Sequence, residues 1–169
     1  MSTSIRTPRL LATAALLGAC SLVQAGLLGS TVSLEYNFLD STTHDSLVVG
    51  NGVEASCPGG LTLCNLLTAT VQTVDFGDTT ITYRYTGGPL LISNGGINGF
   101  DFRDLNGLSI TGVTLSTDMY GFDMKRVTFD QNSVQVVMEG LETLAPDGYF
   151  TLSLATDTGN QVPEPGTMA

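Results

Sequence analysis

Several kinds of residue are scarce in this sequence of 169 residues: it has no tryptophan, one histidine and six basic residues. Sixteen acidic residues outnumber the basic ones and give a formal net charge of −10 at pH 7. Such a surface repels phosphate groups, which argues against binding to nucleic acids or anionic lipids. The absence of tryptophan argues against a binding surface on which aromatic side chains stack against sugar rings. No apolar run reaches the roughly 18 residues that a membrane-spanning helix requires.

The N-terminus has the anatomy of a secretory signal peptide. Two arginines precede an apolar stretch of fourteen residues, Leu10 to Val23, and Val-Gln-Ala then precedes Gly26. As a helix this stretch would rise about 21 Å, which is too short for a bilayer core of about 30 Å. We therefore expect export through the Sec translocon and cleavage by signal peptidase between Ala25 and Gly26. Removal of residues 1–25 leaves four basic residues against sixteen acidic ones, a net charge of −12.

A second cleavage position stays open. The sequence Leu-Gly-Ala-Cys, which ends at Cys20, resembles a bacterial lipobox. Cleavage before Cys20 would give a lipid-anchored protein instead of a freely secreted one. Either cleavage leaves Cys57 and Cys64 as the remaining cysteine pair.

Cys57 and Cys64 are separated by six residues that include a proline and two glycines. This is not a standard zinc spacing, there is no second cysteine pair, and the histidine is distant in the sequence. In an oxidising compartment we expect a disulfide, whose small ring would stabilise the fold by about 2.5 kcal/mol. The alternative is a pair of free, buried thiols.

Between the two ends, apolar and polar residues alternate, as in strands with one buried face. The alternation gives inward-facing sets such as Val32, Leu34, Tyr36 and Phe38. Beta-branched and aromatic residues, which favour strands, fill these segments. The expected strands lie within residues 31–38, 80–85, 99–105, 126–130, 133–138 and 149–154. In the last five we expect the buried residues to be Ile81, Tyr83, Tyr85, Phe100, Phe102, Val127, Phe129, Val134, Val136, Met138, Phe150, Leu152 and Leu154.

Turn residues separate these segments. Gly77-Asp78 predicts a hairpin, Asp130 to Asn132 separates two further strands, and Pro146-Asp147-Gly148 begins the last one. The apolar parity slips across Gly112, which predicts a β-bulge. Residues 61–71 favour at most a short helical turn. The sequence therefore predicts an all-β fold, an antiparallel β-sandwich or jelly-roll-like single domain, over residues 26–160.

Catalytic residues are not indicated by any clear pattern. The histidine, His44, lies beside Asp45 and Ser46, but neighbours in an extended chain point to opposite faces and cannot converge into a triad. The sequence also lacks a Gly-x-Ser-x-Gly motif. We therefore expect His44 to be a loop residue without a role, and the protein not to be an enzyme. Two-carboxylate hydrolysis is a remote alternative, with Asp101 and Asp104, or Asp118 and Asp123, as candidate pairs.

A cofactor is not expected, although calcium is an open alternative. Asp75, Asp78, Asp104 and Asn106 lie at expected loops and offer the oxygen ligands that calcium prefers. The segment Asp-Leu-Asn-Gly resembles only a fragment of an EF-hand loop, without its first ligand spacing or its closing glutamate. The sequence therefore does not identify a definite metal ligand. The second functional hypothesis is a calcium- or carbohydrate-binding module.

The chain ends in Val-Pro-Glu-Pro-Gly-Thr-Met-Ala, after a polar spacer. Val162, Pro163, Glu164 and Pro165 resemble the core of the PEP-CTERM sorting signal of exported bacterial proteins, which exosortase processes. Residues 161–169 would be the start of that signal. Its apolar transmembrane helix and basic cluster do not follow, and we interpret the sequence as truncated at its C-terminus. The alternative is that the signal is incomplete and the protein is simply secreted.

This resemblance implies an exosortase substrate of a Gram-negative bacterium that produces exopolysaccharide. It also implies display at the cell surface or release into the extracellular matrix, with exopolysaccharide as a further partner. The leading hypothesis is therefore an exported, non-catalytic surface or matrix protein. A looser similarity to β-rich regions of such proteins covers most of Val48 to Leu154.

Overall fold

The computed structural model describes residues 26–157 except 69–70, 89, 93–96 and 144–145. The expected signal peptide, with Ala25 at its end, and the sorting motif at Val162 to Pro165 lie outside the described residues. The first residue after the expected cleavage position, Gly26, is described.

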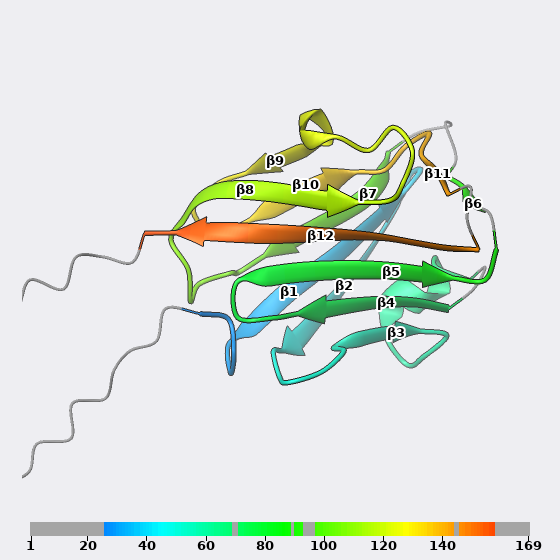
Figure 1. The fold of residues 1–169 in the computed structure, drawn as a ribbon. Helices are drawn as coiled ribbons and strands as arrows, with labels where there is room; N and C mark the ends of the chain where they lie inside the picture. Colours follow the sequence, from blue (N-terminus) through cyan, green and yellow to red (C-terminus); the bar gives the residue numbers. More distant parts are fainter. Residues whose placement is uncertain (1–25, 69–70, 89, 93–96, 144–145, 158–169) are drawn as a thin grey trace, which may run out of the picture.

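Ten strands form two five-stranded antiparallel sheets that pack face to face (Figure 1). We call the first sheet A; its order is β2-β1-β7-β10-β9. The bounds of its strands are Thr31–Phe38 (β1), Ser41–Val48 (β2), Asn98–Arg103 (β7), Val127–Phe129 (β9) and Val134–Val137 (β10). The prediction of an antiparallel β-sandwich is confirmed for the described residues.

The second sheet, sheet B, has the order β3-β4-β5-β12-β8. Its strands are Ala55–Cys57 (β3), Val71–Phe76 (β4), Thr80–Thr86 (β5), Ile110–Thr117 (β8) and Asp147–Thr156 (β12). Two short strands, β6 (Leu90–Leu91) and β11 (Glu142–Thr143), pair separately. Two 3-10 turns complete the described elements: η1 at Thr62–Asn65, within the segment expected to allow a short turn, and η2 at Met124–Arg126.

Aromatic rings tie the two sheets together in the core. Phe100 of sheet A lies 5.1 Å from the ring of Tyr83 and 6.4 Å from that of Phe150, both in sheet B. The hydroxyl groups of two buried tyrosines are hydrogen-bonded: Tyr83 donates to Gln72 over 2.6 Å and Tyr36 donates to Asn98 over 2.9 Å. Burial raises the pKa of Tyr36 to about 12, although its hydrogen bond to Asn98 opposes this shift.

The predicted turns are found where the sequence places them. Gly77 donates its N–H to Thr80 over 2.9 Å and closes the β4–β5 hairpin. Asp130 does the same with Ser133 over 3.0 Å between β9 and β10. The slip at Gly112 is a bulge, because Gly112 pairs with Ala155 while Ile110 pairs with the next residue of β12.

Cys57 and Cys64 form a disulfide, with their Cα atoms 5.2 Å apart. The ring joins the end of β3 to η1, which also receives a second tether from Asp45 of β2. The carboxylate of Asp45 accepts the N–H groups of Thr62 and Leu63 over 2.9 and 2.8 Å. Burial acts to raise the pKa of Asp45, but these hydrogen bonds outweigh it and lower the pKa below its ordinary value.

Three sequence predictions were wrong in detail. Asp75 was expected at a loop, but it lies within β4 and pairs with Thr82 of β5. His44 is not a loop residue: it lies in β2, which pairs with β1 over its whole length. Phe129 was expected in the core with Val127, but Phe129 is 43% exposed. Its strand, β9, is an edge strand of sheet A with a neighbouring strand on one side only. The side chain of Phe129, the last residue of β9, is therefore only partly covered by other residues.

Candidate functional site

A row of polar side chains crosses the outer face of sheet A. The pairing register places His44 opposite Glu35, Glu35 opposite Asp101, Asp101 opposite Gln135, and Gln135 opposite Thr128. Side chains that face one another across neighbouring strands share a face of the sheet. At about 4.8 Å between strands, the row is roughly 19 Å long. We call it the polar row.

Arg103 holds the centre of the polar row. Its guanidinium donates to the Asp101 carboxylate over 2.5 Å and lies 3.4 Å from that of Glu35. The hydrogen bond to Asp101, together with the negative charges of Asp101 and Glu35, raises the pKa of Arg103 above its ordinary value. The Asp101 side chain is only 8% exposed, whereas that of Arg103 is 53% exposed. The sequence indicated correctly that Asp101 points away from the core, but not that its neighbours would cover it.

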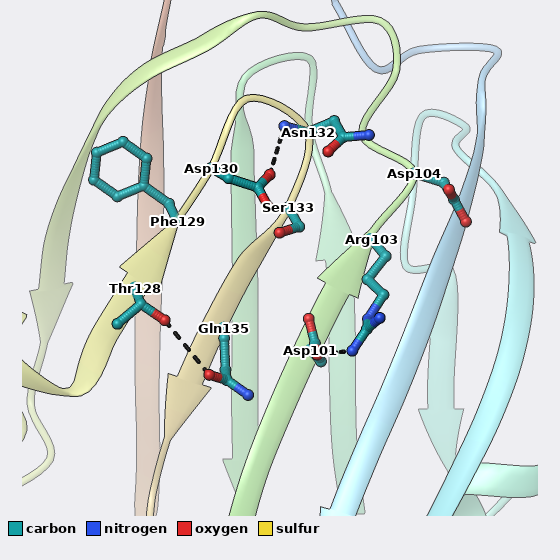
Figure 2. Close-up of a pocket in the computed structure, with 9 residues that line it drawn as sticks. All are labelled: Asp101, Arg103, Asp104, Thr128, Phe129, Asp130, Asn132, Ser133 and Gln135. Atoms are coloured by element: carbon teal, nitrogen blue, oxygen red, sulfur yellow. Dashed lines mark hydrogen bonds and ion pairs between the residues drawn. The ribbon is translucent and has the colours of Figure 1, made fainter.

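An open hollow of about 460 Å³ lies beside this pair, where β7 ends and the β9–β10 turn begins. We call it the Arg103 hollow. Figure 2 shows Asp101 and Arg103 lying toward each other, with Gln135 on the same side as Asp101, while the ring of Phe129 points away from them. Polar residues make up eight of the nine that line it: Asp101, Arg103, Asp104, Thr128, Asp130, Asn132, Ser133 and Gln135, with Phe129 as the ninth.

Hydrogen bonds fix the turn that forms one wall of the hollow. The Asp130 carboxylate accepts the N–H of Asn132 over 2.9 Å, and the side chain of Asn132 donates to Asn106 over 3.3 Å. The carbonyl of Asn132 also accepts the N–H of Leu105 over 3.0 Å. The hydrogen bonds from Asn132 and Ser133 lower the pKa of Asp130, so its carboxylate is charged at neutral pH.

The candidate carboxylate pairs have different surroundings. Asp101 and Asp104 both line the Arg103 hollow, but Asp101 is bound to Arg103. Asp104 has a φ of 57°, in the left-handed region, where the chain turns away from β7. Asp118 accepts the N–H of Tyr149 over 2.8 Å, and Asp123 accepts that of Lys125 at the start of η2 over 2.9 Å. Asp118 and Asp123 therefore hold backbone in place.

His44 has a serine partner that sequence proximity did not suggest. Its Nε2 lies 2.7 Å from the Oγ of Ser33, across the β1–β2 ladder, rather than against its sequence neighbour Ser46. Asp45 points to the opposite side of β2, toward η1. Because β1 pairs with strands on both sides, its backbone N–H groups are used in the sheet. Ser33 therefore lies on a regular sheet face without the backbone donors that an oxyanion hole needs.

The four candidate calcium ligands are divided between two hollows. Asp75 and Asp78 line a second hollow of about 290 Å³ beside Gly50 to Gly52. Asp104 lines the Arg103 hollow, and Asn106 is bonded to its wall through Asn132. Within the described residues, no group of three or more histidine, cysteine, aspartate or glutamate side chains is placed to hold a metal ion.

No protein-family model matches the chain, and neither the curated proteins nor the solved structures contain a significant match. In the part of the chain that the structure describes, none of the helical segments has the length and apolar character needed to span a bilayer.

Proposed function

We propose that the protein is an exported, non-catalytic protein of the bacterial cell surface or extracellular matrix, which an exosortase sorts through its C-terminal signal. The observation that carries this proposal is the Val162 to Pro165 motif, which follows the last strand after a polar spacer. The N-terminal signal sequence supports it independently. A protein with both signals would meet the Sec translocon and signal peptidase first and the sorting enzyme afterwards.

The fold agrees with this assignment in two respects. A disulfide is typical of proteins that fold in oxidising compartments, and Cys57 and Cys64 form one. The first and last described segments also lie near each other, because Leu27 donates its N–H to Asp78 and Leu154 donates to Thr79, both in the β4–β5 turn. The described chain therefore begins and ends at the same end of the sandwich, beside the β4–β5 turn.

We propose the absence of catalysis from the geometry of the three candidate arrangements. The Ser33–His44 pair lies on a regular sheet face where the backbone donors are already used. The acidic pair at Asp118 and Asp123 is committed to backbone hydrogen bonds. In the pair of Asp101 and Asp104, the carboxylate of Asp101 is bound to Arg103. A hydrolytic site needs groups that are free to move a proton or to attack a substrate.

Sorting can be tested with the complete gene in a bacterium that carries an exosortase. The variant would replace Pro163, Glu164 and Pro165 with alanine, and Glu142→Ala, an exposed glutamate of β11, would be the matched control. We expect the wild type and the control at the surface or in the matrix. The triple variant should accumulate in the membrane fraction without C-terminal processing. Normal surface delivery of the triple variant would contradict the proposal.

The coding DNA beyond Ala169 gives a second test. We expect it to encode an apolar helix followed by a basic cluster. A stop codon directly after Ala169 would remove the anchor that sorting requires, and a secreted protein without exosortase processing would then be the better assignment.

A further inference from the structure

We propose that the Arg103 hollow and the adjoining polar row bind an uncharged polysaccharide chain. This inference rests on the proposed function only in that export would bring the hollow among extracellular polysaccharides. Binding itself needs neither sorting nor the C-terminal segment, because the site lies wholly within the sandwich.

The charges at the hollow favour an uncharged ligand. An anionic chain would meet the carboxylates of Asp101, Asp104 and Asp130, on a protein that is strongly acidic overall. A metal ion or other cation would meet the guanidinium of Arg103, which already lies against Asp101. An apolar ligand is disfavoured as well, because polar residues are eight of the nine that line the hollow.

The hydrogen-bonding groups fit a polyhydroxylated ligand. A sugar hydroxyl both donates and accepts, so it is best bound where donors and acceptors alternate. Gln135 pairs with Asp101 in the register, and in Figure 2 the side chains of Arg103 and Gln135 lie on either side of the Asp101 carboxylate. Among the described residues, only one oxygen of Asp101, Oδ2, has a side-chain donor, while Oδ1 has none. A carboxylate that is more than nine-tenths buried and lines a hollow with one free oxygen is suited to accept a ligand hydroxyl.

The shape of the site favours an extended chain over a compact ligand. The hollow is open rather than enclosed, and the polar row continues from it across β7 and β1 to His44. Phe129 is exposed at the rim, but its ring points away from Arg103 in Figure 2. Recognition therefore depends on hydrogen bonds along the row rather than on stacking, which explains why the scarcity of exposed aromatic residues does not exclude a sugar ligand.

Affinity electrophoresis of the protein beginning at Gly26 tests the inference. The gels would contain dextran, mixed-linkage β-glucan, galactomannan or xylan as neutral probes, and alginate as an anionic probe. We expect retardation by at least one neutral polysaccharide, unaffected by EDTA. Asp101→Asn, which removes the charge at nearly constant size, and Gln135→Ala, at an exposed position, should each weaken binding at least tenfold.

Asp75→Asn is the matched control, because Asp75 lies on sheet B and lines the other hollow. It should leave retardation unchanged, and thermal melts should show that all three variants are folded. The proposal is overturned if no neutral probe retards the protein, if only alginate does, if EDTA abolishes binding, or if Gln135→Ala binds as the wild type does. Normal surface delivery of the triple variant at Pro163, Glu164 and Pro165, together with retained retardation, would contradict the proposed function alone.

Discussion

The disulfide between Cys57 and Cys64 should contribute a measurable and separable part of the stability. The bond closes a ring over a sequence separation of seven residues. On the chain-entropy estimate, closing a ring of this size lowers the entropy of the unfolded chain enough to stabilise the fold by about 2.5 kcal/mol. Single domains of this kind are typically stable by about 5–15 kcal/mol, so the reduced protein should remain folded.

The native loop should keep its conformation after reduction. The end of β3 is paired with β4, and Asp45 still binds the N–H groups of Thr62 and Leu63. The effect of reduction is therefore expected mainly in the unfolded state. Replacing both cysteines with alanine should cost somewhat more than reduction, because Cys57 is almost fully buried and its sulfur leaves a small cavity.

Urea denaturation of the protein beginning at Gly26, with and without a reductant, measures the effect. We expect the free energy of unfolding to fall by about 2.5 kcal/mol on reduction, with little change in the slope against urea. The double alanine variant serves as the control, because a reductant should leave it unchanged. A change below about 0.5 kcal/mol on reduction, or two reactive thiols in unfolded, unreduced protein, would refute this reasoning.

Three further predictions concern the two ends of the chain and the core. Cleavage at Ala25 would place the new α-amino group beside the Asp78 carboxylate, against which Gly26 lies. N-terminal sequencing should begin at Gly26, and a lipid-modified Cys20 would contradict cleavage at Ala25. Because the new amino group would face Asp78, Asp78→Asn should destabilise the cleaved protein by up to about 1 kcal/mol at low salt. The pKa of Tyr36 is about 12 in the fold and about 10 in the unfolded chain. The unfolded state therefore loses its proton first, and denaturation curves should show stability that is complete below pH 10 and falls as the pH rises toward 12. Burial also raises the pKa of Tyr83, so Tyr36→Phe should reduce this fall without abolishing it. Deletion of residues 161–169 should change thermal stability by no more than about 0.5 kcal/mol, and unfolding of the deletion variant would show that these residues pack on the sandwich.

Local sequence patterns were enough for the fold class because they depend on neighbouring residues. Alternation in segments such as Val134 to Met138 reports one buried face, whatever lies opposite. Glycine at position 77 and the turn beginning at Asp130 close hairpins between adjacent strands, and the spacing of Cys57 and Cys64 suits a short ring. Each of these features was confirmed.

The strand that carries His44 was missed because its pattern is polar. In β2 only Leu47 is buried, so the residues from Ser41 to Val48 show no apolar alternation. The strand forms through backbone pairing with β1 along its full length. Pairing of this kind depends on the neighbouring strand, and it does not require a recognisable apolar pattern in the sequence of the edge strand.

The candidate binding site was beyond the sequence for a related reason. Asp101 and Gln135 are far apart in the chain, and they meet only because β7 pairs with β10 in one register. The burial of Asp101 depends on Arg103 and on Glu35 from a third strand. The sequence by itself determined which residues could form strands, turns and a disulfide, because those choices depend on near neighbours. Only the tertiary structure decided which polar residues share a face, because strand order and register are set by the packing of the whole sandwich.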